Sequence, residues 1–87
     1  KLHPDHFDPA DLAQEAFNEL QSLATQKGLD YRLSIPEELP VAFTDPVRVR
    51  QLMINLLSHA IKFTPKGTVE AVLLPFGDDS FCFIVRD

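Results

Sequence analysis

Apolar residues recur along this chain with two different periods, one helical and one alternating. Residues 9–27 place apolar side chains at helical spacing on one face, and residues 46–63 do so more broadly. Residues 30–35 alternate between apolar and polar side chains, as in a half-buried strand. Two nearly continuous apolar runs follow, at residues 68–76 and 80–87, and these are typical of strands that lie centrally in a sheet covered by helices on at least one face. We expect a short first strand, a helix, a strand, a second helix and a hairpin, in that order.

Both predicted helices begin with the same pair of residues. Asp8 and Asp45 suit the N-cap position, where a carboxylate accepts a backbone N–H, and each is followed by a proline. Gly28 is expected to end the first helix in the left-handed conformation. A Thr-Pro-Lys-Gly turn at residues 64–67 ends the second. The helix boundaries are therefore predicted from local chemistry alone.

Composition and charge narrow the classes of function. The 87 residues are 45% hydrophobic and 24% charged, an ordinary globular composition for one small domain. The net charge of −5 and the lack of any basic stretch argue against a nucleic-acid partner. Cys82 is alone, so an internal disulfide and a cysteine zinc site are ruled out, and we expect it to be buried. No apolar run approaches the roughly 20 residues that span a bilayer, so we expect a cytoplasmic chain, which a longer parent could still anchor in the inner membrane.

A row of polar side chains follows the second predicted helix. At roughly 100° per residue, Asn55, His59 and Lys62 fall in one narrow sector, together with Arg48 and Gln51. A solvated face is the general interpretation of such a row on an amphipathic helix. Asn and His are only middling helix formers, however, and the row ends beside an aromatic residue and a turn. A cation, an amide and an aromatic ring close together would also suit a charged, planar ligand, so both interpretations stay open.

One stretch of the chain resembles a known family. Residues 45–67, DPVRVRQLMINLLSHAIKFTPKG, followed by a hairpin ending in FIVRD, are similar to the catalytic ATP-binding domain of sensor histidine kinases, within the GHKL group. The family's N box has the form N-L-L-x-N-A-x-K-F-T, and the order of elements matches from about residue 7 to residue 87. The resemblance implies an α+β fold of the Bergerat type, a two-layer α/β sandwich with a mixed β-sheet, helices on one face, and its C-terminal part missing here. The matching residues are Asp45, Arg48, Gln51, Asn55, Leu56, Leu57, Ala60, Lys62, Phe63 and Thr64.

The resemblance implies roles for single residues, because the polar row faces the nucleotide in that family. Asn55 would lie beside the phosphates and Mg²⁺, and Lys62 would meet phosphate oxygens. Phe63 would line the nucleotide cleft. Asp87 matches the aspartate that opens the family's first glycine box, D-x-G-x-G, and would accept a hydrogen bond from the adenine amino group. ATP and Mg²⁺ are the cofactors that these roles imply.

Two positions of the helix bear on activity. His59 stands where the family has its second Asn, at the phosphate and Mg²⁺ site, and an imidazole nitrogen is a poorer Mg²⁺ ligand than an amide oxygen. The change is either tolerated or impairs the Mg·ATP site. Gln51 stands where ATP-hydrolysing members of the group have a general-base Glu. Because Gln cannot take a proton, it fits phosphoryl transfer to a protein side chain instead of hydrolysis.

The resemblance also implies a domain organisation and partners. Residues 1–6 would link to an upstream dimerisation and phosphoacceptor domain, and residues 7–87 would form the N-terminal portion of the ATP-binding domain. The parent would be a homodimer that works with a response regulator or receiver domain. Because the chain ends at the first glycine box, we expect the 87-residue piece to be inactive alone and to bind nucleotide very weakly. Its exposed sheet edge and apolar strand faces should favour self-association.

Three functions stay open at this point. The first is the ATP-binding domain of a two-component sensor histidine kinase, whose parent transfers the γ-phosphoryl group of ATP to a His on its dimerisation domain. The second, motivated by His59, is a degenerate kinase module that regulates signalling through protein–protein interaction with impaired Mg·ATP binding. The third is a small α/β interaction domain with no relation to nucleotides.

Overall fold

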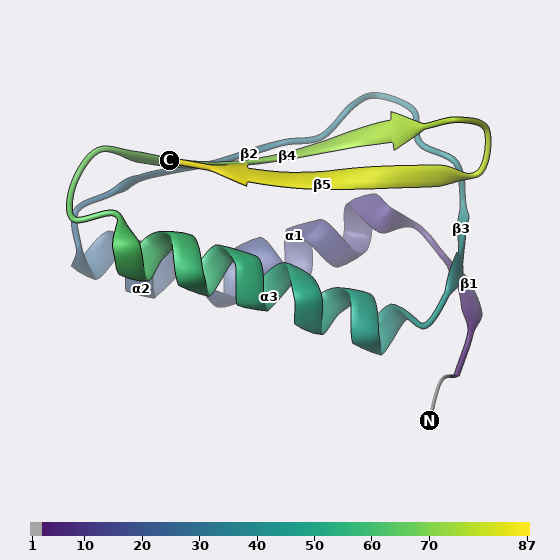
Figure 1. The fold of residues 1–87 in the computed structure, drawn as a ribbon, viewed down its shortest axis with the longest axis horizontal. Coiled ribbons are helices and arrows are strands. Elements are labelled where there is room, and N and C mark those ends of the chain that lie inside the picture. Colours follow the sequence, from purple (N-terminus) through teal and green to yellow (C-terminus); the bar gives the residue numbers. More distant parts are fainter. Residues whose placement is uncertain (1–2) are drawn as a thin grey trace.

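The computed structural model of the chain describes residues 3–87 and has two layers (Figure 1). Its elements, in chain order, are β1 (Asp5–Phe7), α1 (Pro9–Glu19), α2 (Gln21–Gln26), β2 (Asp30–Ser34), β3 (Ala42–Thr44), α3 (Pro46–Phe63), β4 (Thr68–Phe76) and β5 (Ser80–Arg86). The main sheet has the order β2–β4–β5, with β2 parallel and β5 antiparallel to β4. The three helices lie on one face of this sheet. This arrangement confirms the predicted α+β sandwich with a mixed sheet.

A second, two-stranded sheet lies at one end of the molecule. Strand β1 pairs with β3 in antiparallel fashion, with His6 opposite Phe43. The rings of these two residues lie 4.6 Å apart. Residues 5 and 6 of the expected linker therefore take part in strand pairing, while residues 1 and 2 of that range lie outside the described residues.

The core lies between α1, α3 and the inner face of β4. Its buried residues are Leu12, Ala13, Ala16, Met53, Leu57, Ala71 and Leu73, with a smaller cluster of Ala24, Leu29, Ile61 and Val69 beside α2. Both predicted helix starts are confirmed: Asp8 Oδ1 accepts from the Ala10 N–H at 2.9 Å, and Asp45 Oδ1 accepts from the Val47 N–H at 3.1 Å. Asp45 is buried and also accepts from the His3 N–H, which is the main cause that lowers the pKa of its carboxyl group. The N-termini of α1 and α3 are thus capped by side chains.

The first predicted helix is not continuous. It breaks at Leu20 into α1 and α2, although no Pro or Gly stands there. The Tyr31 hydroxyl donates to the Phe17 carbonyl at 3.0 Å, and this is the carbonyl that the N–H of Gln21 would use in an unbroken helix. The Phe17 carbonyl also accepts from the Leu20 N–H at 3.3 Å, so a tightened turn and a tertiary hydrogen bond meet at the break, and local periodicity could not show the second.

Two expectations about β5 are wrong. Within residues 3–87, β5 lies at the edge of the main sheet and only β4 is central. Cys82 is half-buried, because it lies opposite Leu74 on the outer face of the sheet, the face that no helix covers. The apolar runs predicted the two strands correctly. They could not predict which face of the sheet the helices cover. Residues 3–87 contain no helix with both the length and the apolar character needed to cross a membrane.

Candidate functional site

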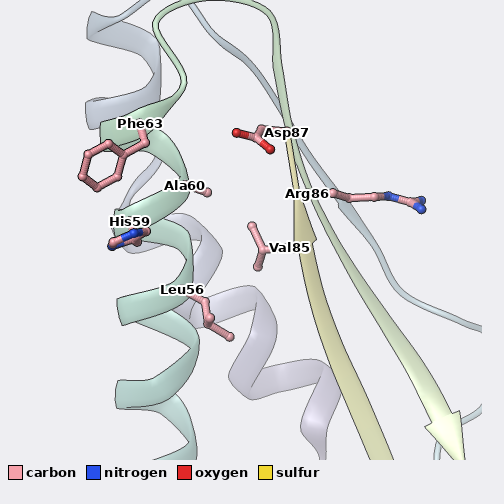
Figure 2. Close-up of a pocket in the computed structure, with 7 residues that line it drawn as sticks. All are labelled: Leu56, His59, Ala60, Phe63, Val85, Arg86 and Asp87. Atoms are coloured by element: carbon pink, nitrogen blue, oxygen red, sulfur yellow. The ribbon is translucent and has the colours of Figure 1, made fainter.

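An open pocket lies where α3 and β5 both end (Figure 2). Its volume is about 260 Å³, and its lining residues are Leu56, His59, Ala60, Phe63, Val85, Arg86 and Asp87. Figure 2 shows Leu56, Ala60 and Val85 between the helix and the strand, where they form an apolar floor. The Asp87 carboxylate points from the strand toward α3, whereas the Arg86 side chain points away, as alternation along a strand requires.

The Asp87 carboxylate is held by a side chain of the turn that follows α3. Thr64 Oγ1 donates a hydrogen bond to Asp87 Oδ2 at 2.9 Å. Thr64 is the C-cap of α3 and is only 6% exposed, so its hydroxyl group has a fixed place. The ends of α3 and β5 are therefore joined by a hydrogen bond directly at the pocket.

His59 and Phe63 form the rim of the pocket on the side of α3 turned away from β5 (Figure 2). Their ring centroids lie 4.6 Å apart at a tilt of 48°. The Phe63 side chain is 60% exposed, and the Lys62 ammonium lies 5.4 Å from its ring centroid, within the range of a cation–π contact. The rim is thus aromatic and carries a positive charge beside it.

Asn55 and Lys62 do not line this pocket. Both are exposed on α3, as are Arg48, Gln51 and His59 of the same row. The Gln51 amide donates to Asn55 Oδ1 at 3.1 Å, which fixes the direction of the Asn55 amide group. Of the five predicted site residues, the structure therefore places His59, Phe63 and Asp87 around one pocket and the other two on the adjoining helix surface.

The sequence did not reveal the role of Lys27. Its ammonium group donates to the carbonyl oxygens of Ile61 and Lys62, at 2.5 and 3.1 Å, and so caps the last turn of α3. Thr64 belonged to the matching motif, but nothing in the sequence assigned it a contact with Asp87. The floor residues Leu56 and Ala60 carried a detectable signal, since both belong to that motif and lie one turn apart on the helix.

The arrangement has a definite chemical character. The floor is apolar, one end holds a carboxylate that accepts hydrogen bonds, and an ammonium group lies beside the rim. Among residues 3–87, no group of three or more His, Cys, Asp or Glu side chains is placed to hold a metal ion by itself. The site therefore suits a flat ligand that brings hydrogen-bond donors at one edge and negative charge at another.

The fold is that of histidine kinase catalytic domains. Full-length ShkA, solved in complex with AMPPNP, matches 98% of this chain with a TM-score of 0.88 and 25% identity, over 18% of its own chain. The cytoplasmic segment of the histidine kinase QseC matches 97% with a TM-score of 0.81 and 27% identity, over 53% of its own chain. The histidine kinase ThkA, solved with the response regulator TrrA, has the same fold at a TM-score of 0.84 and 20% identity, over 97% of this chain and 25% of its own.

Curated relatives agree with the structural similarity, although no family model matches the chain. The adaptive-response sensory kinase SasA of Prochlorococcus marinus (strain MIT 9313) is 40% identical over 66 residues, 76% of this chain. SasA of Trichormus variabilis is 45% identical over 56 residues, 64% of this chain. The chain spans 18% and 14% of the length of these two relatives. It belongs to the sensor histidine kinases, as a portion of their catalytic ATP-binding domain.

Proposed function

We propose that this chain binds ATP as part of a longer two-component sensor kinase. In the complete kinase, the domain would present the γ-phosphoryl group of ATP to a His on the dimerisation domain of a homodimer. The observation that carries the proposal is the pocket in which Asp87, an apolar floor and the rim of α3 lie together. Further support comes from similar proteins: the SasA relatives are sensory kinases, and ShkA was solved with AMPPNP.

The pocket and the helix surface beside it offer a contact for each part of a bound nucleotide. The purine would lie on the floor of Leu56, Ala60 and Val85, with its amino group donating to Asp87. The phosphates would follow the surface of α3 toward Lys62, whose ammonium group offers a point charge. Catalysis of phosphoryl transfer depends mainly on positioning the nucleotide and on stabilising the charge of its phosphates. This set of residues would contribute to both.

The residues present fit a Mg²⁺ ion that arrives with the phosphates. Asn55 offers an amide oxygen, and its bond from Gln51 leaves that oxygen one further lone pair. Mg²⁺ keeps several waters and takes one or two protein oxygens when phosphates supply the rest. When bound, the ion would neutralise phosphate charge. A free Mg²⁺ ion should bind measurably only with nucleotide, because residues 3–87 offer no cluster of carboxylates for it.

The partners and the arrangement of domains follow from the same proposal. Residues 1–6 would connect to the dimerisation domain, and a response regulator would receive the phosphoryl group; ThkA was solved with such a regulator, TrrA. The complete protein would act in the cytoplasm, with or without a membrane anchor elsewhere in its chain.

Replacing the adenine-facing carboxylate tests the proposal. In the intact kinase, Asp87→Asn should weaken ATP binding about tenfold or more, because a charge-assisted hydrogen bond is lost, and should narrow the preference for ATP over GTP. Asp79→Asn, in the exposed β4–β5 turn, removes the same charge away from the pocket and is the matched control. Isothermal titration calorimetry with both nucleotides measures the effect. An intact wild-type kinase that binds no ATP would contradict the proposal.

His59 favours one alternative, a degenerate module that signals by protein–protein interaction. Its ring is exposed at the rim, packs on Phe63, and offers nitrogen where the family has an amide oxygen. In this alternative, His59→Asn should strengthen Mg·ATP binding in the intact kinase by about tenfold or more and should restore autophosphorylation. If the affinity and the autophosphorylation rate stay those of an active wild type, His59 is tolerated and the alternative is wrong.

A further inference from the structure

We propose that Thr64 positions Asp87 so that the site selects adenine over guanine. The inference rests on the proposed function and adds a residue to it. The Thr64 hydroxyl donates to Asp87 Oδ2 at 2.9 Å, and no hydrogen bond within residues 3–87 reaches Oδ1. One carboxylate oxygen is therefore held by the protein and the other is free for a ligand.

Thr64 can fix the position of the Asp87 carboxylate because its own position is fixed. Its side chain is buried, and its N–H donates to the Ile61 carbonyl at 3.4 Å as the chain leaves α3. Lys27 caps the carbonyl of Ile61 from another element, which fixes the same turn. Asp87 directly follows β5, and within residues 3–87 its side chain has a hydrogen bond from Thr64 alone. A free carboxylate there would have to be ordered by the ligand, at a cost in rotamer entropy that the Thr64 hydrogen bond removes in advance.

The direction of this hydrogen bond determines what the pocket accepts. A hydroxyl group has one proton, and Thr64 uses it on Asp87. The free oxygen of the carboxylate is an acceptor only, so the ligand must bring a donor. In one and the same ring orientation, adenine presents its six-position amino group where guanine presents a carbonyl oxygen, which would face the carboxylate without a proton between them. Guanine has donors at N1 and at its 2-amino group, but it would need another orientation in the pocket to bring them to the fixed oxygen. Fixing the carboxylate therefore favours adenine more than it favours guanine.

The test compares ADP and GDP binding to the intact kinase by isothermal titration calorimetry. Thr64→Val keeps the shape of the side chain and removes the hydroxyl; it should weaken ADP binding about five- to tenfold and leave GDP binding nearly unchanged. Thr64→Ser keeps the hydroxyl and should restore most of the ADP affinity. Thr25→Val is the matched control, because Thr25 is exposed on α2 and its hydroxyl donates to the Gln21 carbonyl of its own helix.

A double variant separates positioning from general damage. In the Asp87→Asn background, Thr64→Val should cause no further loss of ADP affinity, because the two side chains act as one unit. Additive losses, equal weakening of ADP and GDP, or wild-type ADP affinity in Thr64→Val would each overturn the inference and leave the proposed function intact. A wild-type kinase that binds no adenine nucleotide would instead overturn the proposed function. If the Thr64→Val variant does not fold, ADP and GDP binding are compared in Thr64→Ala, which also lacks the hydroxyl group.

Discussion

At the residue scale, two lysines near the end of α3 differ in what they can reach. Lys62 lies on the polar row beside the pocket rim, whereas Lys66 lies in the exposed turn before β4. Both are exposed cations, so any difference between them reflects position and not charge. They therefore provide a matched pair for the phosphate-binding role.

Lys62→Gln should weaken ATP binding about tenfold in the intact kinase, and ADP binding less, because a charge-assisted contact to phosphate is lost. Lys66→Gln should leave both affinities near the wild-type values. Titration with ATP and ADP at one fixed ionic strength measures the effect, since screening changes such contacts. Equal losses in the two variants would mean that only overall charge matters.

The place of a residue could be predicted from the sequence where it depends on the spacing of residues within one helix. Asn55, His59 and Lys62 share a face because helical spacing alone places them there. The contacts of Thr64 with Asp87 and of Lys27 with Ile61 could not be predicted, because their partners lie 23 and 34 residues away in the chain. Such pairs meet only after α3, α2 and the sheet have packed.

At the element scale, a side chain of β2 lies at the break between α1 and α2. Tyr31 stacks on Phe17 with ring centroids 3.9 Å apart and donates to its carbonyl. Tyr31→Phe keeps the stacking and removes the donor, so it should lower the free energy of unfolding by about 1 kcal/mol. Urea denaturation near neutral pH measures this change. A variant as stable as the wild type would mean that the hydroxyl does not stabilise the break.

The same tyrosine should make stability depend on pH in the alkaline range. Burial raises the pKa of Tyr31 to about 12, above the value near 10 of an unfolded tyrosine. The stabilisation is complete below about pH 10 and is lost as the pH rises toward 12, because the unfolded chain ionises first. The free energy of unfolding should fall more steeply over this range in the wild type than in Tyr31→Phe. Tyr31 is the only tyrosine, so the difference isolates its contribution, and equal slopes would contradict it.

The ends of a helix could be predicted from the sequence where a capping residue sets them. The two Asp-Pro starts and the left-handed Gly28, with φ of 70°, were predictable because each satisfies backbone groups with neighbouring residues. The Leu20 break was not, since the Tyr31 hydrogen bond that lies at it comes from another element.

At the scale of the whole molecule, the outer face of the main sheet is divided in two. One end carries the ion pairs Arg32–Asp30 and Arg86–Glu70. The other end is apolar, with Leu74, Ile84 and Phe76 exposed by 42%, 42% and 65%. Such a patch beside an edge strand favours association between chains.

The 87-residue chain should therefore self-associate as its concentration rises. Leu74→Lys should shift it toward monomer, because a charge in the apolar patch opposes burial of that face. Ser22→Lys adds the same charge on exposed α2, in the helix layer, and is the matched control. Sedimentation velocity measures the mass; a wild-type chain that stays monomeric at high concentration would contradict this expectation.

The sequence by itself determined the order of elements, the helix starts and the polar row of α3, because each depends on residues within one or two turns of each other. It also determined, through the N-box motif, which residues to examine for a nucleotide. Only the tertiary structure decided that Asp87, Phe63 and His59 surround one pocket, that Thr64 holds Asp87, and that Lys27 caps α3. These contacts join segments far apart in the chain, and burial of the shared core between α1, α3 and β4 is what brings them together.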